Sequence, residues 1–156
     1  MKAWKRSSIL IVEDHNVVRI ALRSLLQEAF PGARILDTAT GREGIAMARE
    51  HRPKAIVMDV RLPDMSGIRA TRLIRRFLPT TAIVMCSLSD TAGNRAAAMR
   101  AGADAWVKKD EAAEVLVPTI HRLRSPNGRT TQTAESGEGA GPIHADAASA
   151  PERYVA

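Results

Sequence analysis

Five short apolar runs, rich in Val and Ile, alternate with longer segments between residues 9 and 107, and this alternation constrains the fold more than any other feature. The runs span residues 9–12, 33–36, 55–58, 82–86 and 105–107. Short runs rich in Val and Ile are typical of strands that are buried on both faces, as in a parallel sheet. The segments between them repeat apolar residues at helical spacing, as Val18, Leu22 and Leu25 do. We therefore predict five strands, each followed by a helix.

Residue types that favour helix ends stand where these helices begin and stop. Thr40, Ser66 and Asp90 are the predicted N-caps of the second, third and fourth helices. Gly32 and Gly102 follow the first and fourth helices, where a left-handed C-cap residue is expected. Strict alternation with right-handed crossovers predicts a doubly wound α/β fold, in which five helices cover both faces of a five-stranded parallel sheet. The common strand order for such a sheet is 2-1-3-4-5.

The chain has 156 residues, enough for one domain of this kind with some sequence left over. We predict an N-terminal extension at residues 1–7, a folded domain at 8–124 and a flexible tail at 125–156. The tail is rich in Gly, Ala, Ser, Thr and Pro and has no periodic apolar face, so burial would not offset the entropy lost on ordering it. Because the tail is too short and polar for a helix-turn-helix, no DNA-binding output domain is expected.

Composition excludes several classes of function. Aromatic residues make up 3% of the chain, too few to stack single-stranded nucleic acid. The single cysteine, Cys86, excludes an internal disulfide and a zinc site built on cysteine pairs, and it suits a reducing cytoplasm. No apolar run is long enough for a signal peptide or a membrane span. The net charge of +6 suits nucleic acid, an acidic membrane surface or an acidic protein, so charge alone identifies no partner.

Acidic residues follow two of the predicted strands at the point where each strand ends. Glu13 and Asp14 come directly after the first strand, and Asp59 comes after the third. In the order 2-1-3-4-5 these strands are neighbours, so we expect the three carboxylates to share one pocket at the carboxyl edge of the sheet. Such a cluster repels itself, and a hard divalent cation relieves the repulsion. Mg²⁺ prefers oxygen ligands of this kind and is the predicted cofactor.

Two further polar residues complete a site for phosphoryl transfer. Ser87 ends the fourth strand and Lys109 follows the fifth. A carboxylate can attack phosphorus and form an acyl phosphate when the charge on the phosphoryl oxygens is neutralised. We predict Asp59 as the attacking group, with Mg²⁺ at one phosphoryl oxygen, Lys109 at a second and Ser87 at the third.

Four separated motifs resemble the receiver domain of two-component response regulators, and they occur in the same order. They are IVEDH at residues 11–15, VMDVRLPDMSG at 57–67, the serine of VMCSLSD, and AGADAWVKKD at 101–110. The resemblance covers residues 8–124 and is closest to receivers of the NarL and FixJ type. It implies a flavodoxin-like fold and a phosphoacceptor at Asp59. It also implies that the metal is held by Glu13, Asp14, Asp59 and the backbone carbonyl of Arg61.

The resemblance further implies a switch and a set of partners. Ser87 moves toward the phosphoryl group, and Lys109 binds it. Trp106 stands where Tyr or Phe is usual, and it either changes rotamer with Ser87 or is a fixed packing aromatic. The face made by the fourth helix, the fifth strand and the last helix then changes its affinity for a downstream protein, and a homodimer could form through the same face. The expected phosphodonor is a histidine kinase or phosphotransfer protein in the cytoplasm. Neither nucleic acid nor a membrane is an expected direct partner.

Three alternatives remain open at this stage. The chain could be the receiver of a transcription regulator that acts on DNA indirectly, or an interaction module that no longer uses phosphorylation. It could also be a Mg²⁺-dependent phosphohydrolase with Asp59 as nucleophile, but Arg61 stands where a second aspartate is expected and no glycine-rich phosphate loop is present. We therefore predict a phosphoaccepting signal protein that does not turn over an external substrate.

Overall fold

The computed structural model of the chain describes residues 4, 7–88 and 91–125. A parallel sheet of five strands runs through its centre in the order β2-β1-β3-β4-β5. The strands are β1 (Ser7–Val12), β2 (Ala33–Thr38), β3 (Ala55–Asp59), β4 (Ala82–Ser87) and β5 (Ala105–Lys108). The predicted fold and strand order are confirmed, and each strand extends one or two residues beyond its apolar run.

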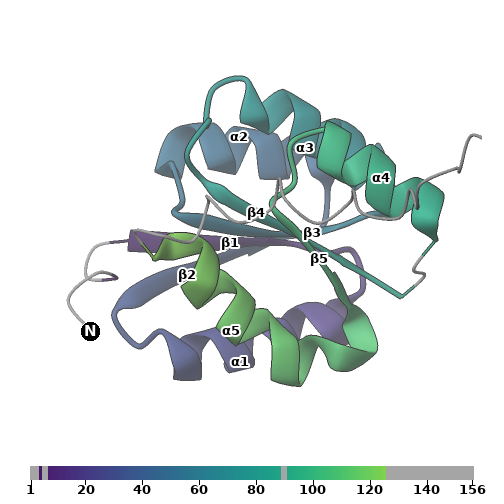
Figure 1. Cartoon of the computed structure of the whole chain (residues 1–156). Coiled ribbons are helices and arrows are strands. Elements are labelled where there is room, and N and C mark those ends of the chain that lie inside the picture. The colour runs from purple at the N-terminus through teal and green to yellow at the C-terminus, as the bar shows by residue number, and fades with distance from the viewer. Residues whose placement is uncertain (1–3, 5–6, 89–90, 126–156) are drawn as a thin grey trace, which may run out of the picture.

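Helices cover both faces of this sheet (Figure 1). They are α1 (Asn16–Ala29), α2 (Gly41–His51), α3 (Gly67–Arg75), α4 (Ala92–Arg100) and α5 (Ala112–Arg124), with the 3-10 helix η2 (Lys109–Glu111) before α5. α1 and α5 lie on one face, and α2, α3 and α4 lie on the other. Trp4, in the predicted N-terminal extension, packs against Phe30 with ring centroids 4.6 Å apart. Of the predicted tail only Ser125 belongs to the described residues, and the rest lies outside them.

Both faces of the sheet are apolar because successive side chains of a strand point to opposite sides. In β1, Ile9 and Ile11 belong to the hydrophobic cluster under α1 and α5, whereas Leu10 and Val12 belong to the cluster under α2, α3 and α4. All four side chains are fully buried. Burial of one such side chain contributes about 1.5–3 kcal/mol. The apolar run of β1 therefore contributes to both halves of the core.

Two of the three predicted N-caps are confirmed. The hydroxyl oxygens of Thr40 and Ser66 accept backbone N–H bonds at the starts of α2 and α3. The N-cap of α4 is Thr91, whose hydroxyl oxygen accepts the N–H of Asn94 at 3.3 Å, so the prediction of Asp90 is wrong by one residue. Asp and Thr are both favoured as N-caps, so the sequence alone does not show which of the two neighbouring residues, Asp90 or Thr91, caps α4.

The C-caps differ more from expectation. Gly102 has a φ of 101°, a conformation that glycine adopts without steric cost. Gly32 does not adopt this conformation, and among the described glycines only Gly102 has a positive φ. α1 instead ends at Phe30, whose N–H bonds to the carbonyl of Leu26. Arg52, with a φ of 44°, is an unpredicted left-handed C-cap of α2.

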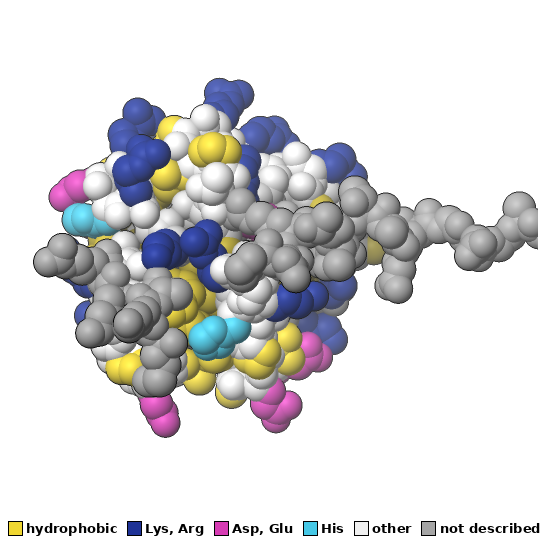
Figure 2. Space-filling model, turned by 60° about the vertical axis from the view of Figure 1, so that its left-hand side comes forward, with side chains coloured by type: hydrophobic (Ala, Val, Ile, Leu, Met, Phe, Trp, Pro, Cys, Tyr) yellow, Lys and Arg dark blue, Asp and Glu magenta, His cyan; other side chains and the backbone are white. Residues whose placement is uncertain are grey.

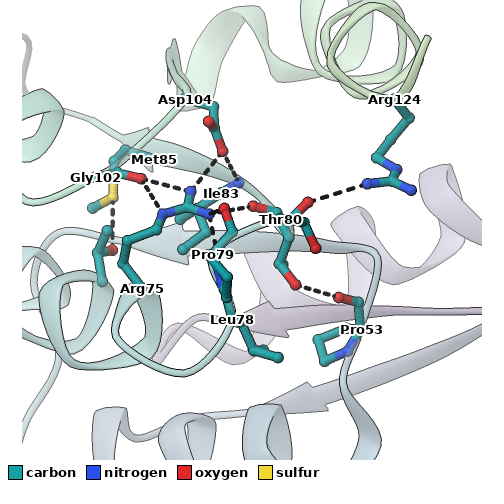
Figure 3. Close-up of polar contacts among 12 residues, drawn as sticks. Pro53, Arg75, Leu78, Pro79, Thr80, Ile83, Met85, Gly102, Asp104 and Arg124 are labelled. Carbon is teal, nitrogen blue, oxygen red and sulfur yellow. Dashed lines mark hydrogen bonds and ion pairs between the residues drawn. The ribbon is translucent and has the colours of Figure 1, made fainter. Parts of the chain in front are cut away.

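Arg75, the last residue of α3, joins two connections at the amino edges of β4 and β5 (Figure 3). Its guanidinium donates to the backbone carbonyls of Leu78, Pro79, Thr81 and Gly102. It also contacts the carboxylate of Asp104 at 2.7 Å. The same carboxylate oxygen accepts the N–H of Ile83 in β4 at 2.8 Å. Arg75 and Asp104 therefore fasten the α3–β4 and α4–β5 connections to each other.

Basic side chains gather over the layer of α2, α3 and α4, in the upper part of Figure 2. The outer face of α3 and its C-cap carry the exposed arginines Arg69, Arg72 and Arg76. Within residues 4, 7–88 and 91–125, no helix is both long and apolar enough to cross a membrane.

Candidate functional site

Three carboxylates meet at the carboxyl edge of the sheet. β1 and β3 are adjacent, with Val12 paired to Met58, so the chain reaches Glu13 and Asp59 at the same level of the sheet. One oxygen from each of Glu13, Asp14 and Asp59 lies within 4.8 Å of the others. Glu13 and Asp59 are 1% and 6% exposed, whereas Asp14 is exposed. The cluster thus combines two buried carboxylates with one that faces solvent.

Lys109 lies between the two buried carboxylates. It follows β5 as the first residue of η2. Its Nζ is 2.6 Å from Oε2 of Glu13 and 2.9 Å from Oδ2 of Asp59, and its side chain is only 7% exposed. Buried charges are tolerated when they are paired in this way. One ammonium group therefore bridges residues that the sequence separates widely.

The buried groups shift one another's pKa values. Burial raises the pKa of Glu13, and the neighbouring Asp59 charge acts in the same direction, while the Lys109 hydrogen bond opposes them. Burial acts to lower the pKa of Lys109, but its contacts with Glu13 and Asp59 outweigh that effect and raise it. Lys109 is therefore a cation at neutral pH. Burial also raises the pKa of Cys86, the register partner of Asp59 in β4, to about 12, so this thiol is unreactive at neutral pH.

Ser87 reaches the same edge of the sheet. It ends β4, is 4% exposed, and stands one position beyond Cys86, which pairs with Asp59.

Trp106 lies in β5 opposite Met85 and packs against the cluster under α2, α3 and α4. Its buried indole Nε1 has no hydrogen-bond acceptor in the described part of the chain. An unpaired buried donor costs about 1–3 kcal/mol, so hydrogen bonding does not favour this position of the indole.

The connection from β3 to α3 closes tightly beside Asp59. The N–H of Gly67 donates to the carbonyl of Val60 at 2.8 Å, and Arg61 and Ser66 form an antiparallel bridge. A Cβ at Gly67 would lie 1.7 Å from the carbonyl oxygen of Asp59, so only glycine permits this approach. The N–H of Arg61 donates to Oδ1 of Asp59 at 3.4 Å. The loop is thereby tied to the carboxylate that it follows.

Sequence reasoning missed two residues that shape this site. Arg19, in α1, donates to the backbone carbonyls of Glu13 at 2.8 Å and Asp14 at 3.3 Å, and so holds the acidic end of β1. Asp64, in the β3–α3 loop, contacts the first turn of α2. Neither residue stands at the end of a strand, the criterion that located the other site residues. No local pattern marks these contacts.

The carboxylate cluster fits a magnesium ion. Three carboxylates against the single Lys109 ammonium leave a net charge of −2, which a divalent cation offsets. All the side-chain donors are hard oxygens, and exposed Asp14 leaves one side open to the water ligands that Mg²⁺ retains. The residues present therefore suit this ion.

Comparison with known proteins places these features in one family. The sequence matches the family "Response regulator receiver domain" over residues 9–121. Response regulator MprA of Mycolicibacterium vanbaalenii is 33% identical over 138 residues, which are 88% of this chain and 58% of that protein. Transcriptional activator protein ExaE of Pseudomonas putida is 30% identical over 115 residues, 74% of this chain and 54% of its own length. The chain thus spans little more than half of these curated relatives.

Solved structures agree with the sequence match. A LuxR-family two-component response regulator from Aurantimonas sp. superposes with a TM-score of 0.70 at 31% identity, covering 75% of this chain and 84% of that one. The chain belongs to the receiver domain family of two-component response regulators. Receiver domains act in phosphorylation signalling with histidine kinases, are generally not enzymes, and bind Mg²⁺ at an acidic pocket such as the one formed by Glu13, Asp14 and Asp59.

Proposed function

We propose that Asp59 accepts a phosphoryl group from a phosphohistidine donor and that the chain passes the signal on by protein contact. The contact of Lys109 with both Asp59 and Glu13 carries this proposal. A cation buried against the acceptor carboxylate reduces the repulsion between that carboxylate and an incoming phosphoryl group. An oxygen of Asp59 forms the new bond to phosphorus while the bond from phosphorus to the donor imidazole breaks, and the imidazole keeps that electron pair.

The other site residues have supporting roles in this proposal. Glu13, Asp14, Asp59 and the backbone carbonyl of Arg61 would hold Mg²⁺, which when bound neutralises charge on the phosphoryl oxygens. Lys109 binds a second oxygen, and the Ser87 hydroxyl donates to the third. These roles keep the acyl phosphate on the protein long enough to be read by a partner, without turnover of an external substrate. The proposal places the chain in the cytoplasm, and its one buried cysteine suits a reducing compartment.

The output is proposed to run through Ser87 and Trp106. When Ser87 moves toward the phosphoryl group, Trp106 changes position, and its unpaired indole N–H gains access to water or a partner. The face of α4, β5 and α5 would then bind a downstream protein or a second copy of the chain. Met99 and Val115 expose apolar side chains on α4 and α5, at 38% and 39%. Two curated relatives are named as a transcriptional activator and a transcriptional regulatory protein, which favours an output in transcription control, reached indirectly.

We also propose a docking surface for the phosphodonor beside the acceptor. A groove of about 380 Å³ lies between α1 and the start of α5, and its lining includes Val17, Leu88 and Lys109. Val17 and Leu88 are 69% and 68% exposed, and together with the groove they form one apolar surface that a partner could cover. The groove reaches Lys109 itself, so a donor seated there would lie next to the acceptor pocket. Its apolar lining favours an apolar helix face as the contacting element.

The docking surface can be tested with the double substitution Val17→Ser and Leu88→Ser. Transfer from a phosphorylated histidine kinase that labels the wild type should slow about 30-fold or more, because burial of each side chain on docking is worth about 1–2 kcal/mol and the double substitution loses both. Labelling by acetyl phosphate, which needs no docking, should change less than twofold. The matched control is Val115→Ser, which removes an exposed apolar side chain of α5 that does not line the groove. Equal slowing with both phosphodonors, or an equal effect of the control, would contradict the assignment.

The proposed function is tested by intact-mass measurement after incubation with acetyl phosphate, with and without Mg²⁺. We expect one base-labile phosphoryl adduct that forms only with Mg²⁺ and is absent in Asp59→Asn, because an amide cannot attack phosphorus as a carboxylate does. Glu114→Gln, which removes an exposed carboxylate of α5, should be labelled like the wild type. Repeated release of phosphate from a small phosphoester would favour the phosphohydrolase alternative. Unlabelled wild type that still binds its partner would favour an interaction module.

A further inference from the structure

Asp64 satisfies the free backbone donors at the start of a helix that lies far from it in the sequence. Its Oδ1 accepts the N–H of Gly41 at 2.8 Å, and its Oδ2 accepts the N–H of Arg42 at 2.8 Å. The next donor, the N–H of Glu43, goes to the Thr40 hydroxyl at 3.3 Å. The first turn of a helix normally leaves such donors unsatisfied unless side chains or water take them. The first turn of α2 is therefore capped jointly by its own N-cap and by the β3–α3 loop.

The tip of the same loop packs against the start of α2. A Cβ at Gly41 would lie 2.5 Å from Cγ of Met65 and 3.3 Å from Cδ1 of Leu62. The absence of a side chain at Gly41 thus lets both apolar side chains approach the helix. Asp64 stands between them in the sequence, so polar and apolar contacts fix the same short segment.

The base of the loop is fixed at Asp59. The hydrogen bond from Gly67 to Val60 and the bridge between Arg61 and Ser66 close it. Arg61 belongs to this closed base, lies three residues before Asp64 at the tip, and donates its N–H to Asp59 Oδ1. A shift of the tip is therefore transmitted to the backbone next to the acceptor carboxylate through a short stretch of chain.

Electrostatics reinforces the contact of Asp64 with α2. The positive end of the helix dipole favours an anion at this place. The hydrogen bond from the Arg42 N–H is the largest of the effects that lower the pKa of Asp64, and the Gly41 N–H and the Arg42 charge act in the same direction. The carboxylate is therefore ionised at neutral pH and accepts both bonds in its stronger, charged form.

We propose that Asp64 is a positioning residue for phosphorylation, which holds the β3–α3 loop on α2 so that Asp59 and the Arg61 backbone keep the geometry needed to receive the phosphoryl group. The inference rests on the proposed function. It adds α2, which contributes no group to the acidic pocket, to the elements that determine how fast Asp59 is modified. Misplacement of reacting groups by about 1 Å can lower a rate by roughly 100-fold, so a modest release of the loop is measurable.

The test compares Asp64→Ala with Thr40→Ala in the full chain. Both substitutions remove a cap from the first turn of α2, but only Asp64→Ala frees the loop, since the Thr40 hydroxyl contacts Glu43 within the helix. We expect acetyl phosphate to label Asp64→Ala about 10-fold more slowly than the wild type, and Thr40→Ala within twofold of it. Asp64→Asn keeps one carbonyl acceptor and the side-chain shape, so its labelling rate should lie between those of Asp64→Ala and the wild type. This variant also tests the proposal if Asp64→Ala fails to fold.

A second measurement does not depend on phosphorylation. The dissociation constant for Mg²⁺, measured by calorimetry, should rise several-fold in Asp64→Ala and stay within twofold in Thr40→Ala, because only the first change loosens Arg61. Equal labelling rates and equal Mg²⁺ affinities in the two variants would overturn the positioning role while leaving the proposed function intact. Wild type that binds Mg²⁺ but takes no phosphoryl group would instead overturn the proposed function. In that case the Mg²⁺ affinities alone decide whether Asp64 positions the pocket.

Discussion

Replacement of Lys109 by Met is expected to lower the rate of phosphorylation of Asp59 by about 100- to 1000-fold, the loss typical when a preorganised donor is removed from developing negative charge. Met fills much of the same space but carries no charge. The buried carboxylates of Glu13 and Asp59 then lose the ammonium that lies 2.6 Å and 2.9 Å from them. Their mutual repulsion and their repulsion of the incoming phosphoryl group both rise in a poorly solvated pocket.

The rate is measured by intact mass during incubation with acetyl phosphate and saturating Mg²⁺. Lys108→Met is the matched control, because Lys108 precedes Lys109 directly but is 40% exposed and pairs only loosely with Glu111 at 3.6 Å. We expect the control to be labelled within twofold of the wild-type rate. Urea unfolding of both variants shows whether the domain remains folded. A Lys109→Met protein that is folded and labelled as fast as the control would refute the central role of this residue.

Replacement of Arg75 by Ala is expected to lower the free energy of unfolding by about 2–4 kcal/mol, a large effect for a single substitution. The guanidinium donates hydrogen bonds to four backbone carbonyls and to the carboxylate of Asp104. Its loss leaves Asp104 without its cation and the carbonyls without their donor. Fully buried pairs cost roughly 3–5 kcal/mol when one partner is removed. We expect a smaller loss for Arg75 because the side chains of Arg75 and Asp104 are 20% and 22% exposed, so water partly screens their charges.

Arg72→Ala provides the control for this prediction. Arg72 lies one turn earlier on the same helix, is exposed, and has no ion pair in the described part of the chain, so its loss should change stability by no more than about 0.5 kcal/mol. The comparison is made by urea unfolding with a common slope, so that a shift in midpoint reports stability. Equal midpoints for the two variants would show that the Arg75 network contributes nothing net.

The layered fold was predictable because its signals are local. Each apolar run, from residues 9–12 to 105–107, lies within a few consecutive residues. Four of the five have no polar interruption, and only the run of the edge strand β2 is interrupted, by the exposed Arg34. The N-caps at Thr40 and Ser66 are equally local, since the capping side chain and its donor are two or three residues apart. The predictions that failed, Asp90 and Gly32, concern helix ends where neighbouring residues offer equivalent solutions.

The acidic pocket was predictable for a related reason. Parallel strands bring their carboxyl ends to one edge, so a residue type at a strand end already implies a place in the fold. Glu13, Asp14 and Asp59 were located in this way, and the structure brings them within 4.8 Å of one another. Their roles in phosphoryl transfer remain predictions.

The sequence by itself determined the number of strands and the chemical character of the edge at which they end, while their predicted order was the one common to such sheets. Only the tertiary structure decided that Lys109 reaches both buried carboxylates, that Asp64 caps a helix begun 23 residues earlier, and that Arg75 joins two distant connections. The physical reason is range. Hydrophobic periodicity and capping act between close neighbours in the chain, whereas a long charged side chain takes whichever partner the packing of other elements brings within about 3 Å of it.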